Sequence, residues 1–258
     1  SLGVYSTGVN VDGTKAMYNQ NINSKVVGLV GIQVKAHENL KLQAWDIFTD
    51  NVFNTAMVQA DLAFPQKNGS LIIAAAQFIK QDAINNGGNA DAAKTYFEKG
   101  SGSISFGAKA GWKNKTWEAT LNYNRITGNG RYLMPREWGR EPFFTFLPRE
   151  RNEGFGDVHA VMAKVNYHIP GTGIKTSLAA GYYHLPDVRN YRLNKYGLPS
   201  YTQVNADARY AFGGFLKGLD AQLLVVAKLR SGETYNNPKY EFNKVNMILY
   251  NFVLNYHF

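Results

Sequence analysis

The chain has 258 residues, 45% of them hydrophobic, and carries a net charge of +9. It contains no Cys, which excludes disulfides, thiol catalysis and thiolate metal sites. The longest apolar run, residues 71–76, is far shorter than the roughly 18–20 residues of a membrane-spanning helix.

Polar and apolar residues alternate along most of the chain, which is the period of a β-strand with one apolar face. A first strand is predicted near residues 2–10, and a helical turn or two within residues 90–98. Further strands are predicted at residues 26–36, 40–48, 54–64, 71–79, 103–112, 115–124, 158–168, 174–184, 201–212, 219–230 and 244–258. The sequence therefore predicts an all-β chain of about twelve strands.

The last stretch, residues 244–258, shows the alternation over the greatest length. One of its faces is apolar and aromatic: Ile248, Tyr250, Phe252, Leu254, Tyr256 and Phe258. A strand of this length can cross a bilayer when tilted, which takes roughly 9–11 residues, whereas about five or six is usual in soluble domains. An aromatic C-terminal residue on the apolar face resembles the signal by which the barrel-assembly machinery recognises bacterial outer-membrane barrels.

The connections between the predicted strands alternate in length. Short turns at residues 37–39, 65–69, 113–115, 170–173 and 213–217 alternate with mostly long loops at residues 11–24, 80–102, 125–157, 185–199 and 231–243. Outer-membrane barrels have short periplasmic turns and long extracellular loops. We therefore expect residues 1–258 to form one transmembrane domain, an antiparallel up-and-down β-barrel in the outer membrane of a Gram-negative bacterium. A soluble sandwich with a long edge strand is the alternative.

The start of the chain bears on its export. A protein of the outer membrane is made with a signal peptide, and residues 1–4 (Ser-Leu-Gly-Val) read as mature sequence. We therefore expect the N-terminus to be processed or truncated.

If the apolar face of each strand contacts lipid, the polar face lines the interior, because a charge at the bilayer midplane costs about 2–4 kcal/mol. Ten basic residues are assigned to the interior and outnumber the acids there: Lys25, Lys35, Lys41, Lys109, His159, Lys164, Lys175, Arg209, Lys228 and Arg230. A row of cations along a low-dielectric wall concentrates anions and confers selectivity on a pore. Two interpretations stay open: Arg209, Lys228 and Arg230 pass a carboxylate along the wall, or they offset Asp207 and Asp220 in a lattice of ion pairs.

The longest connection, residues 125–157, holds six Arg and five acidic residues together with Pro and aromatic residues. Pro and aromatic residues reduce the entropy cost of ordering a loop, and long ordered loops are commonly functional. We expect this loop to fold into the lumen and narrow it, with a cap on the outer surface as the alternative. The candidate constriction residues are Arg136, Glu137, Arg140, Arg149 and Arg151.

Three segments resemble the OprD family of substrate-specific outer-membrane porins: residues 138–144 (Trp-Gly-Arg-Glu-Pro-Phe-Phe), residues 45–54 and the aromatic C-terminus. The resemblance implies an eighteen-stranded monomeric barrel of which this chain covers the later two-thirds; a barrel of twelve strands is the alternative. It also implies a loop between the thirteenth and fourteenth strands that helps form the constriction, which maps onto residues 125–157. The family's ladder of basic wall residues maps onto Arg209, Lys228 and Arg230, with Lys175 and Lys164.

The resulting prediction is a porin, and not an enzyme, for passive and substrate-selective diffusion of small carboxylate-bearing solutes, either organic anions or amino acids. Outer-membrane lipid is the expected surrounding, a monomer is favoured, and nucleic acid is not expected as a partner because the basic residues form no consecutive block. No cofactor or metal is expected, since the five His show no ligand spacing. The alternatives are an outer-membrane phospholipase, in which His184 would need a neighbouring Ser, and a plugged structural or adhesive barrel.

Overall fold

The computed structural model describes residues 3–257, so that Ser1, Leu2 and Phe258 lie outside the described part. One antiparallel sheet contains every strand in chain order. The strands are β1 (Val27–His37), β2 (Leu40–Thr49), β3 (Phe53–Pro65), β4 (Leu71–Ala83), β5 (Gly102–Lys113), β6 (Trp117–Ile126), β7 (Val158–His168), β8 (Ile174–His184), β9 (Tyr201–Ala211), β10 (Leu219–Arg230) and β11 (Met247–Tyr256). Short 3-10 segments lie in the connections: η1 (Ala92–Lys94), η2 (Arg136–Trp138), η3 (Gly214–Leu216) and η4 (Pro238–Tyr240).

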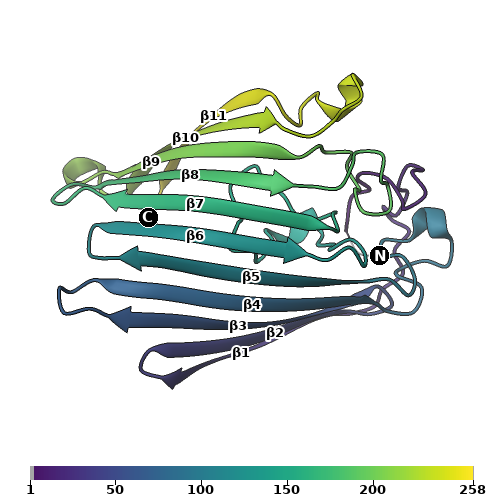
Figure 1. Cartoon of the computed structure of the whole chain (residues 1–258), viewed down its shortest axis with the longest axis horizontal. Coiled ribbons are helices and arrows are strands. Elements are labelled where there is room, and N and C mark those ends of the chain that lie inside the picture. Colours follow the sequence, from purple (N-terminus) through teal and green to yellow (C-terminus); the bar gives the residue numbers. More distant parts are fainter. Residues whose placement is uncertain (1–2, 258) are drawn as a thin grey trace.

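The predicted all-β, up-and-down architecture is confirmed. Within residues 3–257, no helix is long and apolar enough to cross a membrane. The connections alternate between the two ends of the sheet, as Figure 1 shows. One end carries the short turns at residues 38–39, 66–70, 114–116, 169–173 and 212–218, and is called the short-turn end. The other, the long-loop end, carries residues 50–52, 84–101, 127–157, 185–200 and 231–246.

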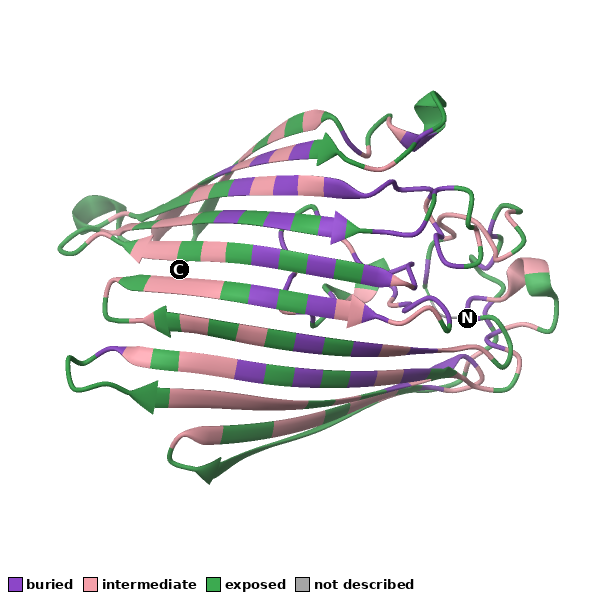
Figure 2. Ribbon diagram, in the orientation of Figure 1, coloured by how far each residue is buried: buried purple, intermediate pink, exposed green. Residues whose placement is uncertain are grey.

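The side chains of each strand alternate between an outward apolar face and an inward polar face. On β6, Leu121 and Tyr123 are exposed, whereas Asn122 and Asn124 are buried on the opposite face. Figure 2 shows this alternation as bands of buried and exposed residues along the middle strands. Because the strands pair directly, the inward positions of neighbours lie side by side, as Asn122 does with Met162 of β7.

The sheet is open within the described residues. Antiparallel ladders join each strand to the next, and none in residues 3–257 joins β1 to β11. Figure 1 shows the sheet as one curved wall. The described part of the chain therefore forms an open wall of eleven strands, one fewer than predicted.

The missing strand is the first one. Apart from one bridge between Val9 and Lys15, residues 3–26 pair with no other segment as a strand, so the prediction for residues 2–10 is wrong in its described part. Gly8 and Gly13 have φ values of 71° and 87°, which interrupt any extended run. The apolar side chains of this segment instead join a buried cluster at the long-loop end: Val4, Ala16, Tyr18, Ile22, Val52, Phe53, Tyr96, Phe97 and Leu133.

The main buried cluster lies between the inward face of the sheet and the connection at residues 127–157. The strands contribute Ile79, Ile126, Tyr183 and Tyr201, and the connection contributes Tyr132, Phe143 and Phe155. Aromatic side chains bury large areas, so this packing fixes the loop against the wall.

Candidate functional site

Residues 127–157, which connect β6 to β7, lie against the inward face of the sheet. Gln77 Nε2 on β4 donates a hydrogen bond to the carbonyl oxygen of Pro142 at 3.1 Å. Four strands away, Tyr183 Oη on β8 donates to the carbonyl oxygen of Thr145 at 2.8 Å. The loop is therefore held to the wall from both sides.

The tip of this loop is bound by β9 and β10. Gln203 Nε2 and Asn205 Nδ2 both donate to the carbonyl oxygen of Pro148, at 2.9 and 3.0 Å. Lys228 Nζ donates to the carbonyl oxygen of Arg149 at 3.3 Å. These wall side chains donate hydrogen bonds to two consecutive loop carbonyls and so fix the tip against the wall.

The tip is a tight turn at residues 147–150. Glu150 N donates to Leu147 O at 3.0 Å, and Glu150 Oε2 accepts from Leu147 N at 3.1 Å. Pro148 at the second position and a φ of 71° at Arg149 are the features of a type II turn, whose third residue is ordinarily Gly or Asn.

This turn lies between two cavities. Leu147 and Pro148 line a smaller cavity of about 410 Å³ at the short-turn end. Arg149 and Glu150 line a larger cavity of about 810 Å³ at the long-loop end. The basic residues around the larger cavity are Arg136, Arg140, Arg149, Arg151, Lys228 and Lys244. Four of the five predicted constriction residues therefore surround one cavity.

A buried acid neutralises part of the charge around the larger cavity. Glu153 is 1% exposed, and its Oε2 lies 3.4 Å from Arg151 Nη1 and 3.9 Å from Arg136 Nε. Its Oε1 lies 3.9 Å from Lys195 Nζ, and Tyr196 Oη donates to its Oε2 at 2.7 Å. Arg136 and Arg151 are therefore ion-paired, and Glu153 links the loop to residues 185–200.

The remaining predicted loop residues behave differently. Arg140 and Arg149 have no ion-pair partner within residues 3–257, although the Arg140 guanidinium lies 5.6 Å from the ring centroid of Phe146. Glu137 does not line the larger cavity, and its Oε1 accepts a hydrogen bond from Tyr5 N at 3.0 Å. Glu137 thus ties the N-terminal segment to the loop.

Two further acids of the loop, Glu141 and Glu150, are buried. Asn152 N donates to Glu141 Oε1 at 2.6 Å. Burial raises the pKa of Glu141 to about 7. Burial and the nearby charge of Glu141 raise the pKa of Glu150 well above its ordinary range. The net positive charge of the larger cavity is therefore greatest at acidic pH.

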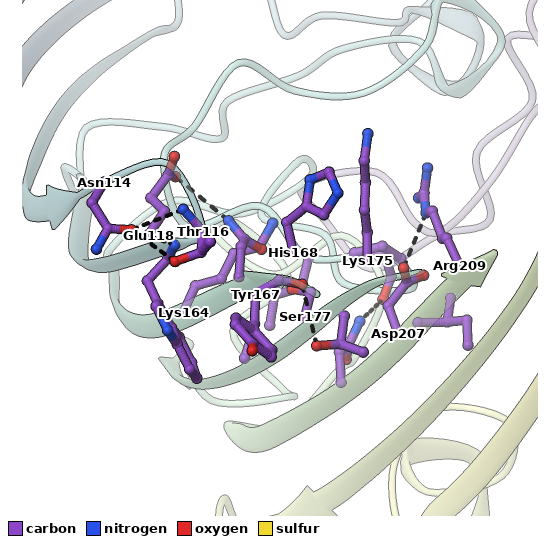
Figure 3. A pocket seen from close by; sticks show the side chains of 18 of the residues that line it. Asn114, Thr116, Glu118, Lys164, Tyr167, His168, Lys175, Ser177, Asp207 and Arg209 are labelled. Atoms are coloured by element: carbon purple, nitrogen blue, oxygen red, sulfur yellow. Dashed lines mark hydrogen bonds and ion pairs between the residues drawn. The ribbon is translucent and has the colours of Figure 1, made fainter. Parts of the chain in front are cut away.

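The smaller cavity is lined by Lys164, Lys175 and Arg209 of β7, β8 and β9. Lys175 pairs across the sheet with His168 and with Arg209, and Figure 3 shows these three side chains pointing the same way. Arg209 Nε lies 3.0 Å from Asp207 Oδ1. Lys164 and Lys175 have no ion-pair partner in the described part of the chain. Arg209 is therefore offset by an acid, whereas Lys164 and Lys175 make no ion pair within residues 3–257. Lys115 and the acid Glu118 also line this cavity.

Lys228 and Arg230 of β10 do not continue this row. Lys228 is 6% exposed, and its Nζ lies 4.1 Å from the ring centroid of Tyr201. Arg230 lines neither of the two cavities, and its Nη1 lies 3.0 Å from Glu241 Oε1 at the long-loop end. The predicted ladder thus divides into a row on the wall, a buried lysine and an ion-paired arginine.

The other predicted inward cations are placed as follows. Three of them face inward and line a further cavity near the short-turn end: Lys35, Lys41 and Lys109. Lys25 precedes β1, and its backbone N donates to Asp50 Oδ2 at 3.1 Å, so its assignment to a strand is wrong. His159 lies on the outward face, where its Nδ1 is 2.8 Å from Tyr123 Oη, because it is an odd number of residues from Lys164.

Sequence reasoning missed the amides that hold the loop. Gln77, Gln203 and Asn205 are buried inward residues of central strands, and each donates to a loop carbonyl. Gln81 acts in the same way, since its Nε2 donates to Leu133 O at 2.7 Å and its Oε1 accepts from Leu133 N. A row of uncharged amides at inward positions was the available signal for a loop bound to the wall.

The geometry around His184 bears on the phospholipase alternative. His184 is on the outward face, with its ring 6.4 Å from that of His159. Within residues 3–257, no Ser hydroxyl forms a hydrogen bond with it, and no group of three or more His, Asp or Glu could hold a metal ion.

No protein-family model and no curated protein matches the chain. Its fold is similar to that of OccAB4 from Acinetobacter baumannii, with a TM-score of 0.64 and 17% identity over 78% of this chain and 48% of that one. It is also similar to a double variant of OccD1 (OprD), with a TM-score of 0.68 and 12% identity over 88% of this chain and 57% of that one. OccK5 (OpdH) from Pseudomonas aeruginosa gives a TM-score of 0.62 and 14% identity over 78% and 52%. The chain spans about half the length of these structures, and the resemblance to OprD porins is confirmed for the fold.

Proposed function

We propose that this chain forms part of the wall and a constriction of an outer-membrane porin, and that this porin passes small carboxylate-bearing solutes by passive diffusion. The similarity of its fold to OccAB4, OccD1 and OccK5 supports a porin. The proposal gives each face of the sheet one role: the outward face contacts lipid, and the inward face lines a water-filled path.

The outward face has the composition of a lipid-facing surface. At the short-turn end of β6, Trp117 stacks on Tyr167 of β7 with ring centroids 4.0 Å apart. At the long-loop end, Tyr123 of β6 and Tyr182 of β8 are exposed. Six residue steps from Trp117 to Tyr123, at about 3.3 Å each, span about 20 Å. An apolar band of roughly this height between two aromatic girdles is typical of outer-membrane barrels.

The observation that carries the proposal is the position of unpaired cations on both sides of the loop tip. Arg140 and Arg149 line the larger cavity, and Lys164 and Lys175 line the smaller one. Cations beside a narrow aqueous path attract anions and let them move from site to site. Small organic anions, or amino acids bound through their carboxylate, suit this arrangement.

The test is the ion selectivity of the native protein in planar lipid bilayers. We expect open-channel current, and reversal potentials in gradients of potassium chloride and of potassium salts of small carboxylic acids that show preference for the anion. Neutralising Lys164 and Lys175 together is expected to weaken that preference. Cation selectivity that this double substitution leaves unchanged would contradict the proposal.

The same preparation separates the two alternatives. A plugged structural barrel gives no open-channel current in the bilayer. An outer-membrane phospholipase hydrolyses phospholipid in detergent and loses that activity in the His184→Ala variant. We expect channel current and no such hydrolysis.

A further inference from the structure

We propose that Arg149 sets the anion preference of the channel, and that Lys228 is a positioning residue that holds Arg149 in place. This inference rests on the proposed function, and it gives the leading role to a residue predicted for the constriction loop and a supporting role to one predicted for the wall ladder.

The backbone of Arg149 is in a conformation that its side chain disfavours. Its φ of 71° lies in the left-handed region, where a Cβ atom is crowded by the neighbouring carbonyl. Asn or Asp occupies six of the other eight non-Gly positions with positive φ in residues 3–257, as their short polar side chains allow. A charged residue held in strain at a loop tip indicates that its side chain is used.

The surrounding contacts over-determine this turn. Glu150 bonds Leu147 through both its backbone N–H and its carboxylate. The carbonyl before Arg149 accepts from Gln203 and Asn205, and the carbonyl of Arg149 itself accepts from Lys228. The turn is therefore rigid, and the Arg149 side chain projects from a fixed point.

Arg149 shares with Arg140 the lack of an ion-pair partner in the described residues, but the Arg140 guanidinium lies over the ring of Phe146. The Arg149 side chain is exposed and lines the larger cavity, whereas Arg136 and Arg151 are paired with Glu153. The turn that carries it lies between the two cavities, because Leu147 lines one and Arg149 the other. A solute that moves between the cavities passes this charge.

Lys228 is placed to act on Arg149, and although it lines the larger cavity it is almost fully buried. Its ammonium group lies over the ring of Tyr201 and donates to the backbone of Arg149, and the residue is 6% exposed. A buried ammonium that hydrogen-bonds a carbonyl contributes mainly to the geometry of the loop. Its effect on selectivity should therefore pass through Arg149.

The experiment measures the permeability ratio of chloride to potassium in planar bilayers for the native protein and its variants. Arg149→Gln is expected to lower the ratio about three- to tenfold, the effect of one unit charge close to the path under partial screening. Arg149→Lys should keep the ratio. Arg149→Gly should lower it as far as Arg149→Gln does, although Gly adopts the positive φ without strain. Arg189→Gln is the matched control, because Arg189 is exposed and lies over the Tyr235 ring outside both cavities.

The role of Lys228 is tested by a double-mutant cycle. Lys228→Met alone should lower the ratio, and Lys228→Met with Arg149→Gln should lower it no further than Arg149→Gln alone. Additive effects would make Lys228 an independent path cation and overturn its positioning role. An unchanged ratio in Arg149→Gln, with a reduced ratio in Lys175→Gln, would overturn the assignment of Arg149 and leave the porin intact. A native protein without channel current would overturn the proposed function itself.

Discussion

The two cavities on either side of the turn at residues 147–150 hold their cations by different means. Around the smaller cavity, Lys164, Lys175 and Arg209 lie on consecutive strands, and the backbone ladders place them. Around the larger cavity, the arginines lie on a loop that is held in place by aromatic packing, side-chain hydrogen bonds, buried acids and a few backbone hydrogen bonds to residues 185–200. Charges on a strand are therefore robust to single substitutions, whereas charges on the loop depend on pH and on a few contacts.

The largest expected effect comes from removing the loop. Replacing residues 136–151 by a short Gly-Ser link should raise single-channel conductance severalfold and weaken anion preference, because one cavity loses most of its cations and the path widens. Single-channel recording measures both quantities. The control shortens residues 90–94, which line neither cavity and should leave conductance unchanged. Equal conductance in the two variants would mean that the loop lies outside the path.

The next effect is a pH dependence of how firmly the loop at residues 127–157 docks beside the larger cavity. The pKa of Glu141 is raised by burial from 4.5 to about 7, so the docked loop favours the protonated acid. The stabilisation of the docked loop by protonated Glu141 is fully present below pH 4.5 and is lost as pH rises through about 7. The free energy of docking changes by at most about 3 kcal/mol over this range. The neighbouring charges of Glu150, Glu153 and Arg151 modulate this value.

Hydrogen exchange of the loop amides between pH 4 and pH 8 measures this effect. Protection should fall as pH rises, and Glu141→Gln should weaken this pH dependence and leave the part that comes from Glu150. Protection that rises with pH in the native protein would mean that ionised Glu141 stabilises the docked loop, which contradicts this prediction.

A smaller effect is expected from the wall amides. Gln203→Leu removes one of the two donors to the Pro148 carbonyl and should weaken loop docking by about 1 kcal/mol. Trypsin cleavage within residues 136–151 should then be faster by about fivefold. Thr202→Val, on the outward face of the same strand, is the matched control. Equal cleavage rates in the two variants would show that these hydrogen bonds do not hold the loop.

The smallest effect is expected at Arg230. Because Arg230 is paired with Glu241 and lines neither cavity, Arg230→Gln should leave the permeability ratio unchanged. The free energy of unfolding should change by less than about 0.5 kcal/mol, as for exposed ion pairs. If Arg230→Gln lowered the permeability ratio as much as Lys175→Gln does, Arg230 would be one of the cations that line the solute path.

Most of the sheet could be predicted from the sequence. The predicted bounds of β7, β8 and β10 agree with the structure to the residue, since their alternation is clean and ends at turn residues. β4 extends four residues beyond its predicted end, because Lys80 and Asp82 interrupt the apolar pattern while the ladder to β5 continues. β11 begins at Met247, after Asn246 in a left-handed conformation with φ 53°.

The site was predictable only in part. The loop and its four cavity-lining arginines stood out by composition, and the direction of Lys164, Lys175 and Arg209 followed from the period of two residues. The burial of Lys228, the pairing of Arg136 with Glu153 and the docking by Gln77 did not follow from any local pattern.

By itself, the sequence determined which residues face lipid and which face the interior, because that choice is a local property of a pleated backbone. Only the tertiary structure decided which inward charges remain free. The contacts that decide it join residues far apart in the chain, such as Gln77 and Pro142 at a separation of 65 residues and Lys228 and Arg149 at 79. Such contacts depend on how a loop folds back onto the wall, and no period in the sequence encodes that path.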